Sequence, residues 1–93
     1  MSMKSLLENY KVEGFWNSEF GLDIIEKFDL FSVENSELVR IDGDEGLLIL
    51  DRALNNVIYF LNVANDEISD LYSTNDFCEA KEVYEEIFEA YKK

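Results

Sequence analysis

The central part of the chain, Glu37–Asn62, consists of apolar runs separated by short polar breaks. Residues 38–41 and Val57–Leu61 are rich in branched and aromatic side chains, which favour strands. Between them, Leu47–Leu50 is apolar at every position, so its faces must be covered by other elements or by a partner. A short fourth strand is expected at Ile68–Tyr72. The pattern therefore predicts an antiparallel meander of three or four strands.

Two polar segments connect these strands. Asp42–Gly46 has the composition of a hairpin turn, and Asp51–Asn56 makes the next connection, in which Asn55-Asn56 is able to take left-handed backbone angles. The first segment also resembles the start of a calcium loop. An EF-hand loop beginning at Asp42 requires glycine at its sixth position and glutamate at its twelfth, where this chain has Leu47 and Ala53. We therefore interpret it as a turn and predict no metal site.

The carboxy-terminal segment has the clearest helical pattern. Ser73–Asp76 supplies capping residues. Apolar residues then recur every three or four positions: Phe77, Ala80, Tyr84, Ile87, Phe88 and Tyr91. The opposite face carries an acidic ridge: Glu79, Glu82, Glu85, Glu86 and Glu89. An amphipathic helix packed against one face of the sheet is expected.

The amino-terminal part has a less regular pattern. A short helix is expected over residues 3–10, and Asn17-Ser18 offers an N-cap for a second helix that ends near Phe28. Gly21 weakens this helical pattern, so a strand over Leu22–Phe31 remains an alternative.

Length and composition fit these elements into one acidic domain. The chain has 93 residues, of which 47% are hydrophobic, enough for one core but not for two. We expect an α+β fold spanning residues 1–93: a three- to four-stranded antiparallel meander, a carboxy-terminal amphipathic helix on one face, and short amino-terminal helical elements.

Charge is the largest compositional signal. Twenty-one Asp and Glu residues face eight Lys and Arg, for a net charge of −13. Binding to nucleic acid or to an anionic membrane is disfavoured, because both need clustered cations. The surface therefore serves solubility or attracts a basic protein. The chain shows no secretion signal and no apolar run of membrane-spanning length, so a cytoplasmic location is expected.

Candidate catalytic chemistry is sparse. There is no histidine, so the single cysteine, Cys78, has no imidazole to activate it. Carboxylate pairs arise by chance among 21 acids, and they do not define a site. We expect no enzyme activity and no cofactor, and Cys78 is interpreted as a half-exposed structural residue.

The candidate partner-binding residues are mostly acids of the expected turns and of the helical ridge. Trp16 is added as an anchor on condition that it is exposed, because Phe15-Trp16 is more typical of a core pair. The full set is Asp42, Asp44, Glu45, Asp66, Glu67, Asp70, Glu79, Glu82, Glu86 and Trp16.

The carboxy-terminal half resembles the SUKH superfamily of bacterial toxin-immunity proteins. The matching pattern is a strand with a Gly/Asp turn (Ile41–Gly46), an apolar strand ending in aspartate (Leu47–Asp51), an aromatic strand (Asn56–Phe60), and the passage Tyr72–Phe77 into the last helix. The amino-terminal half departs from the family, since it lacks the Leu-Pro that the family tends to carry before its central helix. The resemblance implies a small protein that neutralises a toxin, often a nuclease, by covering its active surface.

The sequence thus predicts an immunity protein or inhibitor that occludes a basic toxin domain through electrostatically steered binding. One alternative is a phage-type nucleic-acid mimic that blocks a defence or transcription protein. Another is a small adaptor or subunit whose acidity serves solubility only.

Overall fold

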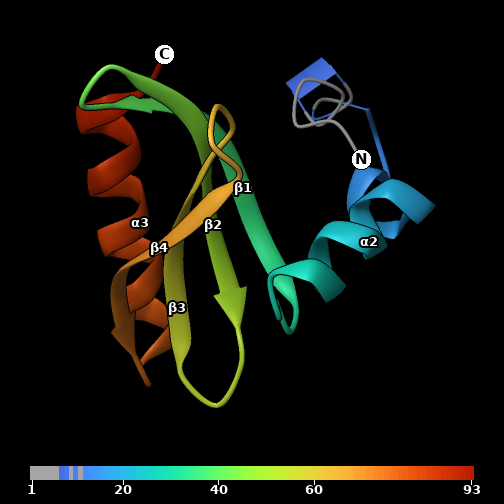
Figure 1. The fold of residues 1–93 in the computed structure, drawn as a ribbon. Coiled ribbons are helices and arrows are strands. Elements are labelled where there is room, and N and C mark those ends of the chain that lie inside the picture. Colours follow the sequence, from blue (N-terminus) through green and yellow to red (C-terminus); the bar gives the residue numbers. More distant parts are fainter. Residues whose placement is uncertain (1–6, 9, 11) are drawn as a thin grey trace.

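The computed structural model describes residues 7, 8, 10 and 12–93. Its elements are η1 (Phe15–Asn17), α2 (Glu19–Lys27), β1 (Val33–Ile41), β2 (Asp44–Arg52), β3 (Asn56–Asn62), β4 (Glu67–Thr74) and α3 (Phe77–Tyr91). The expected α+β fold is confirmed (Figure 1). The helix expected over residues 3–10 lies largely outside the described residues.

The four strands form one antiparallel sheet in the order β1-β2-β3-β4, which confirms the meander. The central position of β2 explains its apolar run. Leu47 and Ile49 enter one core cluster, and Leu48 and Leu50 enter another on the opposite face. Both faces are therefore covered by this chain itself.

The two core clusters are closed by different helices (Figure 1). On one face, Phe15 of η1 and Ile24 of α2 pack on β2. On the other face, Ala80 and Tyr84 of α3 pack on it, and the Tyr84 hydroxyl donates a hydrogen bond to the Leu48 carbonyl oxygen at 3.3 Å. The molecule thus has three layers, with the sheet between the two helical segments.

The hairpin between β1 and β2 is tighter than expected. Only Asp42 and Gly43 form the turn, with φ of 52° and 86°, and Ile41 pairs directly with Asp44. Two consecutive left-handed residues are typical of a two-residue hairpin whose twist matches the strands. The remaining residues of the predicted turn, Asp44 to Gly46, belong to β2.

Asn55 and Asn56 do not use the left-handed backbone angles that asparagine is able to take. The non-glycine residues with positive φ in the described chain are Asp29, Asp42 and Asp66. Asn56 is extended because it already pairs with Arg52 in the ladder, and its buried side-chain amide donates to the Thr74 carbonyl oxygen at 3.4 Å.

In the amino-terminal part, residues Glu19–Lys27 form a helix and not the alternative strand. Ser18 caps α2 by accepting a hydrogen bond from the Gly21 N–H at 3.1 Å, so the strand over Leu22–Phe31 is wrong. Gly21 lies against η1, where any Cβ would collide with the Phe15 carbonyl oxygen. Gly21 therefore allows α2 to pack closely against η1.

Helix α3 begins where the capping residues predict. The Asp76 carboxylate accepts hydrogen bonds from the N–H groups of Cys78 and Glu79, at 3.0 and 3.4 Å. The apolar stripe is buried at Ala80 and Tyr84, whereas Tyr91 at its end is 42% exposed. Within the described part of the chain, no helix is long and apolar enough to cross a membrane.

Candidate functional site

Most of the candidate turn acids meet at one end of the sheet. In a meander the β1–β2 and β3–β4 connections lie at the same end. Asn62, at the end of β3, donates through its side-chain amide to the Asp44 carboxylate at 3.1 Å. Asp42, Asp44, Glu45, Asp66 and Glu67 therefore lie at this end, whereas Asp70 lies further along β4 opposite Tyr59.

Two of these acids are neutralised. The Glu45 carboxylate lies 2.5 Å from an Arg40 guanidinium nitrogen and 2.9 Å from the Lys93 ammonium, and hydrogen bonds from these cations lower the pKa of Glu45. Asp66 forms an ion pair with Lys27. Both acids are paired with cations of this chain itself, which makes them weaker candidates for a partner than their position in turns indicates.

The ridge on α3 has the geometry that the sequence predicts. Glu79, Glu82 and Glu86 are exposed on the side of the helix opposite Tyr84. Glu79 accepts a hydrogen bond from the Thr74 hydroxyl at 2.6 Å. This bond joins the end of β4 to the start of α3, and burial together with Glu79 raises the pKa of Tyr72.

Lys and Arg are unevenly distributed along the sequence. Residues 53–80, which contain β3 and β4, include no Lys or Arg. By contrast, Arg40, Lys92 and Lys93 gather beside β1, where Lys92 pairs with Val39. This asymmetry was not predicted, although the long stretch without a cation is visible in the sequence.

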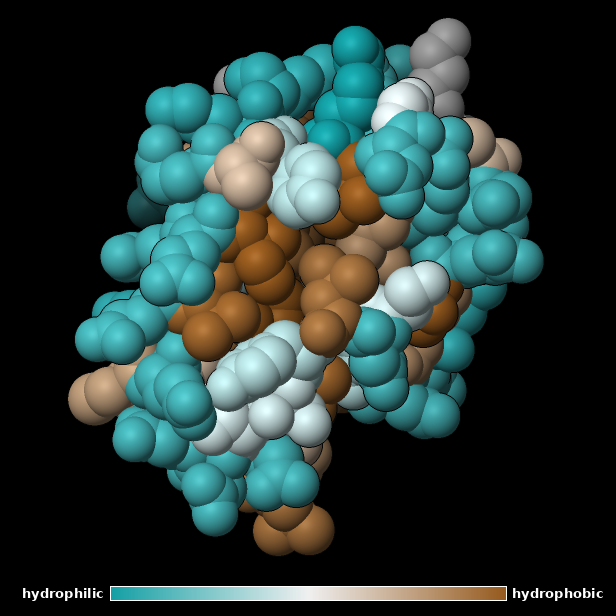
Figure 2. Space-filling model, turned by 90° about the vertical axis from the view of Figure 1, so that its left-hand side faces the viewer, coloured by the Kyte–Doolittle hydropathy of each residue, from teal (hydrophilic) through white to brown (hydrophobic). Residues whose placement is uncertain are grey.

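An apolar hollow accompanies this acidic side. Figure 2 views the molecule from the side of α3 and β4, and hydrophobic surface fills its centre inside a hydrophilic rim. The half-buried side chains of Val83 and Ile87 lie on one flank of α3, and Phe60 of β3 is 7% exposed. Phe88, on the other flank, lines a small cavity with Tyr10 of the β1 side. Val83 and Ile87 therefore face β3 and β4.

Trp16 is not an exposed anchor, so the condition attached to it is not met. Its indole N–H donates to the Ser36 hydroxyl at 2.9 Å, and its ring meets Phe15 edge to face at 5.0 Å between centroids. Both aromatic residues pack in the core beneath α2. The pair is structural, as its composition predicts.

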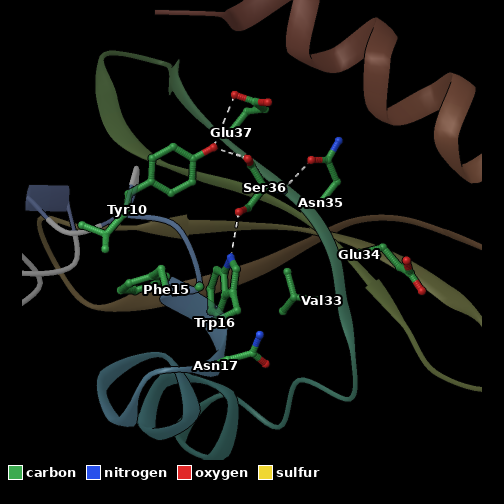
Figure 3. Close-up of a pocket in the computed structure, with 11 residues that line it drawn as sticks. Tyr10, Phe15, Trp16, Asn17, Val33, Glu34, Asn35, Ser36 and Glu37 are labelled. Carbon is green, nitrogen blue, oxygen red and sulfur yellow. Dashed lines mark hydrogen bonds between the residues drawn. The ribbon is translucent and has the colours of Figure 1, made fainter.

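Trp16 also lines a cleft of about 500 Å³ between η1 and β1 (Figure 3). The Tyr10 hydroxyl crosses it to donate to the Ser36 carbonyl oxygen, and lies 3.3 Å from the Glu37 carboxylate. Burial and the charge of Glu37 raise the pKa of Tyr10. These polar groups are hydrogen-bonded to one another. The bonds across the cleft therefore hold Tyr10 and Trp16 against β1.

Among the described residues, no group of three His, Cys, Asp or Glu side chains is placed to hold a metal ion. Cys78 is more exposed than expected and lies in the first turn of α3.

Comparison with known proteins returns no match to a family model, a curated protein or a solved structure. The resemblance to the SUKH superfamily therefore stays a prediction.

Proposed function

We propose that this protein is a cytoplasmic inhibitor, most concretely an immunity protein, that binds and occludes a basic toxin domain such as a nuclease. The observation that carries the proposal is the coincidence of two features on one side of the molecule. The β3, β4 and α3 region combines exposed acids with partly exposed apolar side chains, and residues 53–80 add no cation.

Each feature has a separate role in the mechanism. Exposed carboxylates such as Glu82 and Glu86 attract a cationic partner over a distance comparable to the Debye length and so raise the association rate. Once the surfaces meet, burial of apolar side chains such as Val83 and Ile87 slows dissociation. The bound protein then covers the surface through which the partner contacts its own anionic substrate.

A nucleic-acid mimic is the second candidate, favoured by one observation. The ridge acids follow a single face of α3, a helix of 15 residues, which corresponds to about 22 Å. A row of carboxylates of this length imitates only a few phosphates. The adjacent apolar side chains have no counterpart on a phosphate backbone, and they favour the inhibitor over the mimic.

The experiment is affinity capture from the native host, followed by association kinetics at 0.05 and 0.5 M salt. A basic partner is expected, with an association rate at least about tenfold lower at the higher salt concentration. Glu82→Lys should slow association more than Asp23→Lys, which makes the same charge change on α2 at the other face. A neutral partner whose association rate ignores salt would overturn the proposal.

A further inference from the structure

The two edges of the sheet differ in whether their outward backbone groups are already hydrogen-bonded. The outer edge of β1 is occupied: the Ser36 carbonyl oxygen accepts the Tyr10 hydroxyl, the Ser36 N–H donates to the Asn35 side chain at 3.1 Å, and Val39 pairs with Lys92. A strand from another protein has no access to these backbone groups. Pairing through the sheet must therefore use β4.

The outer edge of β4 is open. The Val63 N–H bonds the Glu45 carbonyl oxygen, and the alternation of the ladder from this bond directs the backbone groups of Asp70 and Ser73 away from β3. Within the described residues, no hydrogen bond from another element reaches them. The register shift opposite Ile58–Tyr59 leaves Leu71 unpaired, and this side chain is 39% exposed.

The open edge borders the apolar hollow of Figure 2. Across the ladder from Phe60, which is 7% exposed, β4 carries the short, exposed side chain of Ser69. The flank of α3 with Val83 and Ile87 closes the other side. A side chain of an added strand would find apolar neighbours here.

The negative charge along the β4 edge indicates which kind of strand could pair with it. The edge carries Asp70 on the α2 face and Glu67 on the α3 face, Glu79 lies nearby at the start of α3, and residues 53–80 themselves include no Lys or Arg. A second copy of this chain would place acid against acid, which destabilises strand pairing. A strand with Lys or Arg at alternate positions meets the opposite charge instead.

We propose that β4 accepts an extended segment of the partner as a fifth strand, with alternating cationic and aliphatic side chains. The cations would lie on the α2 side of the sheet, facing Asp70, and the aliphatic side chains would enter the hollow beside Val83 and Ile87 on the α3 side. This inference rests on the proposed function and names the surface and the kind of segment that it recognises.

The direct test uses an eight-residue peptide that alternates lysine and valine, titrated into the isotope-labelled protein. Amide shifts should concentrate in residues 67–74 and around Val83 and Ile87. A copy with alternate peptide nitrogens methylated keeps its charge but loses its donors, and should bind at least about tenfold more weakly. Equal binding of both peptides, or shifts spread over every acidic surface, would overturn strand addition.

Variants at Ser73 provide a matched pair. Ser73→Pro removes an outward N–H from an edge strand, a position where proline is tolerated, whereas Ser73→Ala keeps the N–H. The proline variant should bind the peptide at least about fivefold more weakly with an unchanged far-ultraviolet spectrum, and the alanine variant should bind normally. Equal affinities of the two folded variants would contradict the inference.

The captured partner separates this inference from the proposed function. If a basic partner is recovered and binds Ser73→Pro as tightly as the original protein, the β4 site is wrong while the inhibitor proposal stands. If no basic partner is recovered, the inhibitor proposal is wrong, and the peptide titration still decides whether β4 accepts a cationic strand.

Discussion

Asp51 shows how a single residue secures the start of the sheet. Its carboxylate, 1% exposed at the end of β2, accepts hydrogen bonds from the N–H groups of Phe31 and Ser32 at 2.7 and 2.6 Å. These two N–H groups lie in the segment that joins α2 to β1. The aspartate therefore holds the connection between the helical layer and the first strand.

Replacing Asp51 by alanine should destabilise the fold by about 2–4 kcal/mol, because two N–H groups in a partly buried site lose a charged acceptor. Asp51→Asn keeps one acceptor oxygen and should cost less. Urea unfolding monitored by circular dichroism measures both effects. Asp23→Ala on the exposed side of α2 is the control, expected within about 0.5 kcal/mol of the original protein. A similar effect of Asp51→Ala and Asp23→Ala would contradict this role.

Glu45 should make part of the stability dependent on pH. Its hydrogen bonds with Lys93 and Arg40 lower its pKa in the folded protein below the ordinary value of 4.5. Its contribution is therefore present above about pH 4.5 and is lost as pH falls below that value. Glu45→Gln should lower the urea midpoint at pH 7 but have little effect at pH 3. An equal loss at both pH values would indicate packing instead of charge.

At the scale of elements, Gly21 tests how α2 is held against η1. An added Cβ would collide with the Phe15 carbonyl oxygen and lie 2.8 Å from the Trp16 Cα. Gly21→Ala should therefore destabilise the protein by about 1–3 kcal/mol although alanine is the better helix former. Gly14→Ala is the comparison, since its Cβ would meet nothing within 4 Å and only its φ of 80° opposes the change. Stabilisation by Gly21→Ala would show that α2 moves freely on η1.

The elements that the sequence predicts well are those with strong local patterns. The strands from β2 to β4 and the helix α3 follow from apolar runs and from the capping residue Asp76. The start of β1 at Val33 does not, because Glu34, Asn35 and Ser36 are polar. These residues are in a strand because they pair with β2, a long-range contact that local propensity does not contain.

The same limit applies to the candidate site. Position in a turn or on a helix face predicts exposure, and this succeeded for Glu82 and Glu86. The position of an acid in the sequence does not reveal whether it is neutralised. Glu45 is neutralised in part by Lys93, which is brought beside it by the packing of α3 across the sheet. The open β4 edge and its hollow likewise depend on the order of the strands and on where α3 lies.

For the whole molecule, a net charge of −13 should make stability depend on salt. Repulsion among the acids opposes the compact state, and it is screened when ionic strength rises. Increasing sodium chloride from 0.02 to 0.5 M should raise the urea midpoint, although it weakens the exposed ion pairs such as Lys27–Asp66. A lower midpoint at high salt would show that these ion pairs outweigh the repulsion.

The two core clusters lie on opposite faces of the sheet, and this has a practical consequence for spectroscopy. Trp16, the single tryptophan of the chain, belongs to the cluster beneath α2, on the opposite face from α3. Its fluorescence should therefore follow the integrity of the α2 layer and stay nearly constant when a ligand without tryptophan occupies the other side. The protein thus carries a built-in optical reference: binding that leaves the emission unchanged is remote from α2, and binding that shifts it has reached the amino-terminal layer.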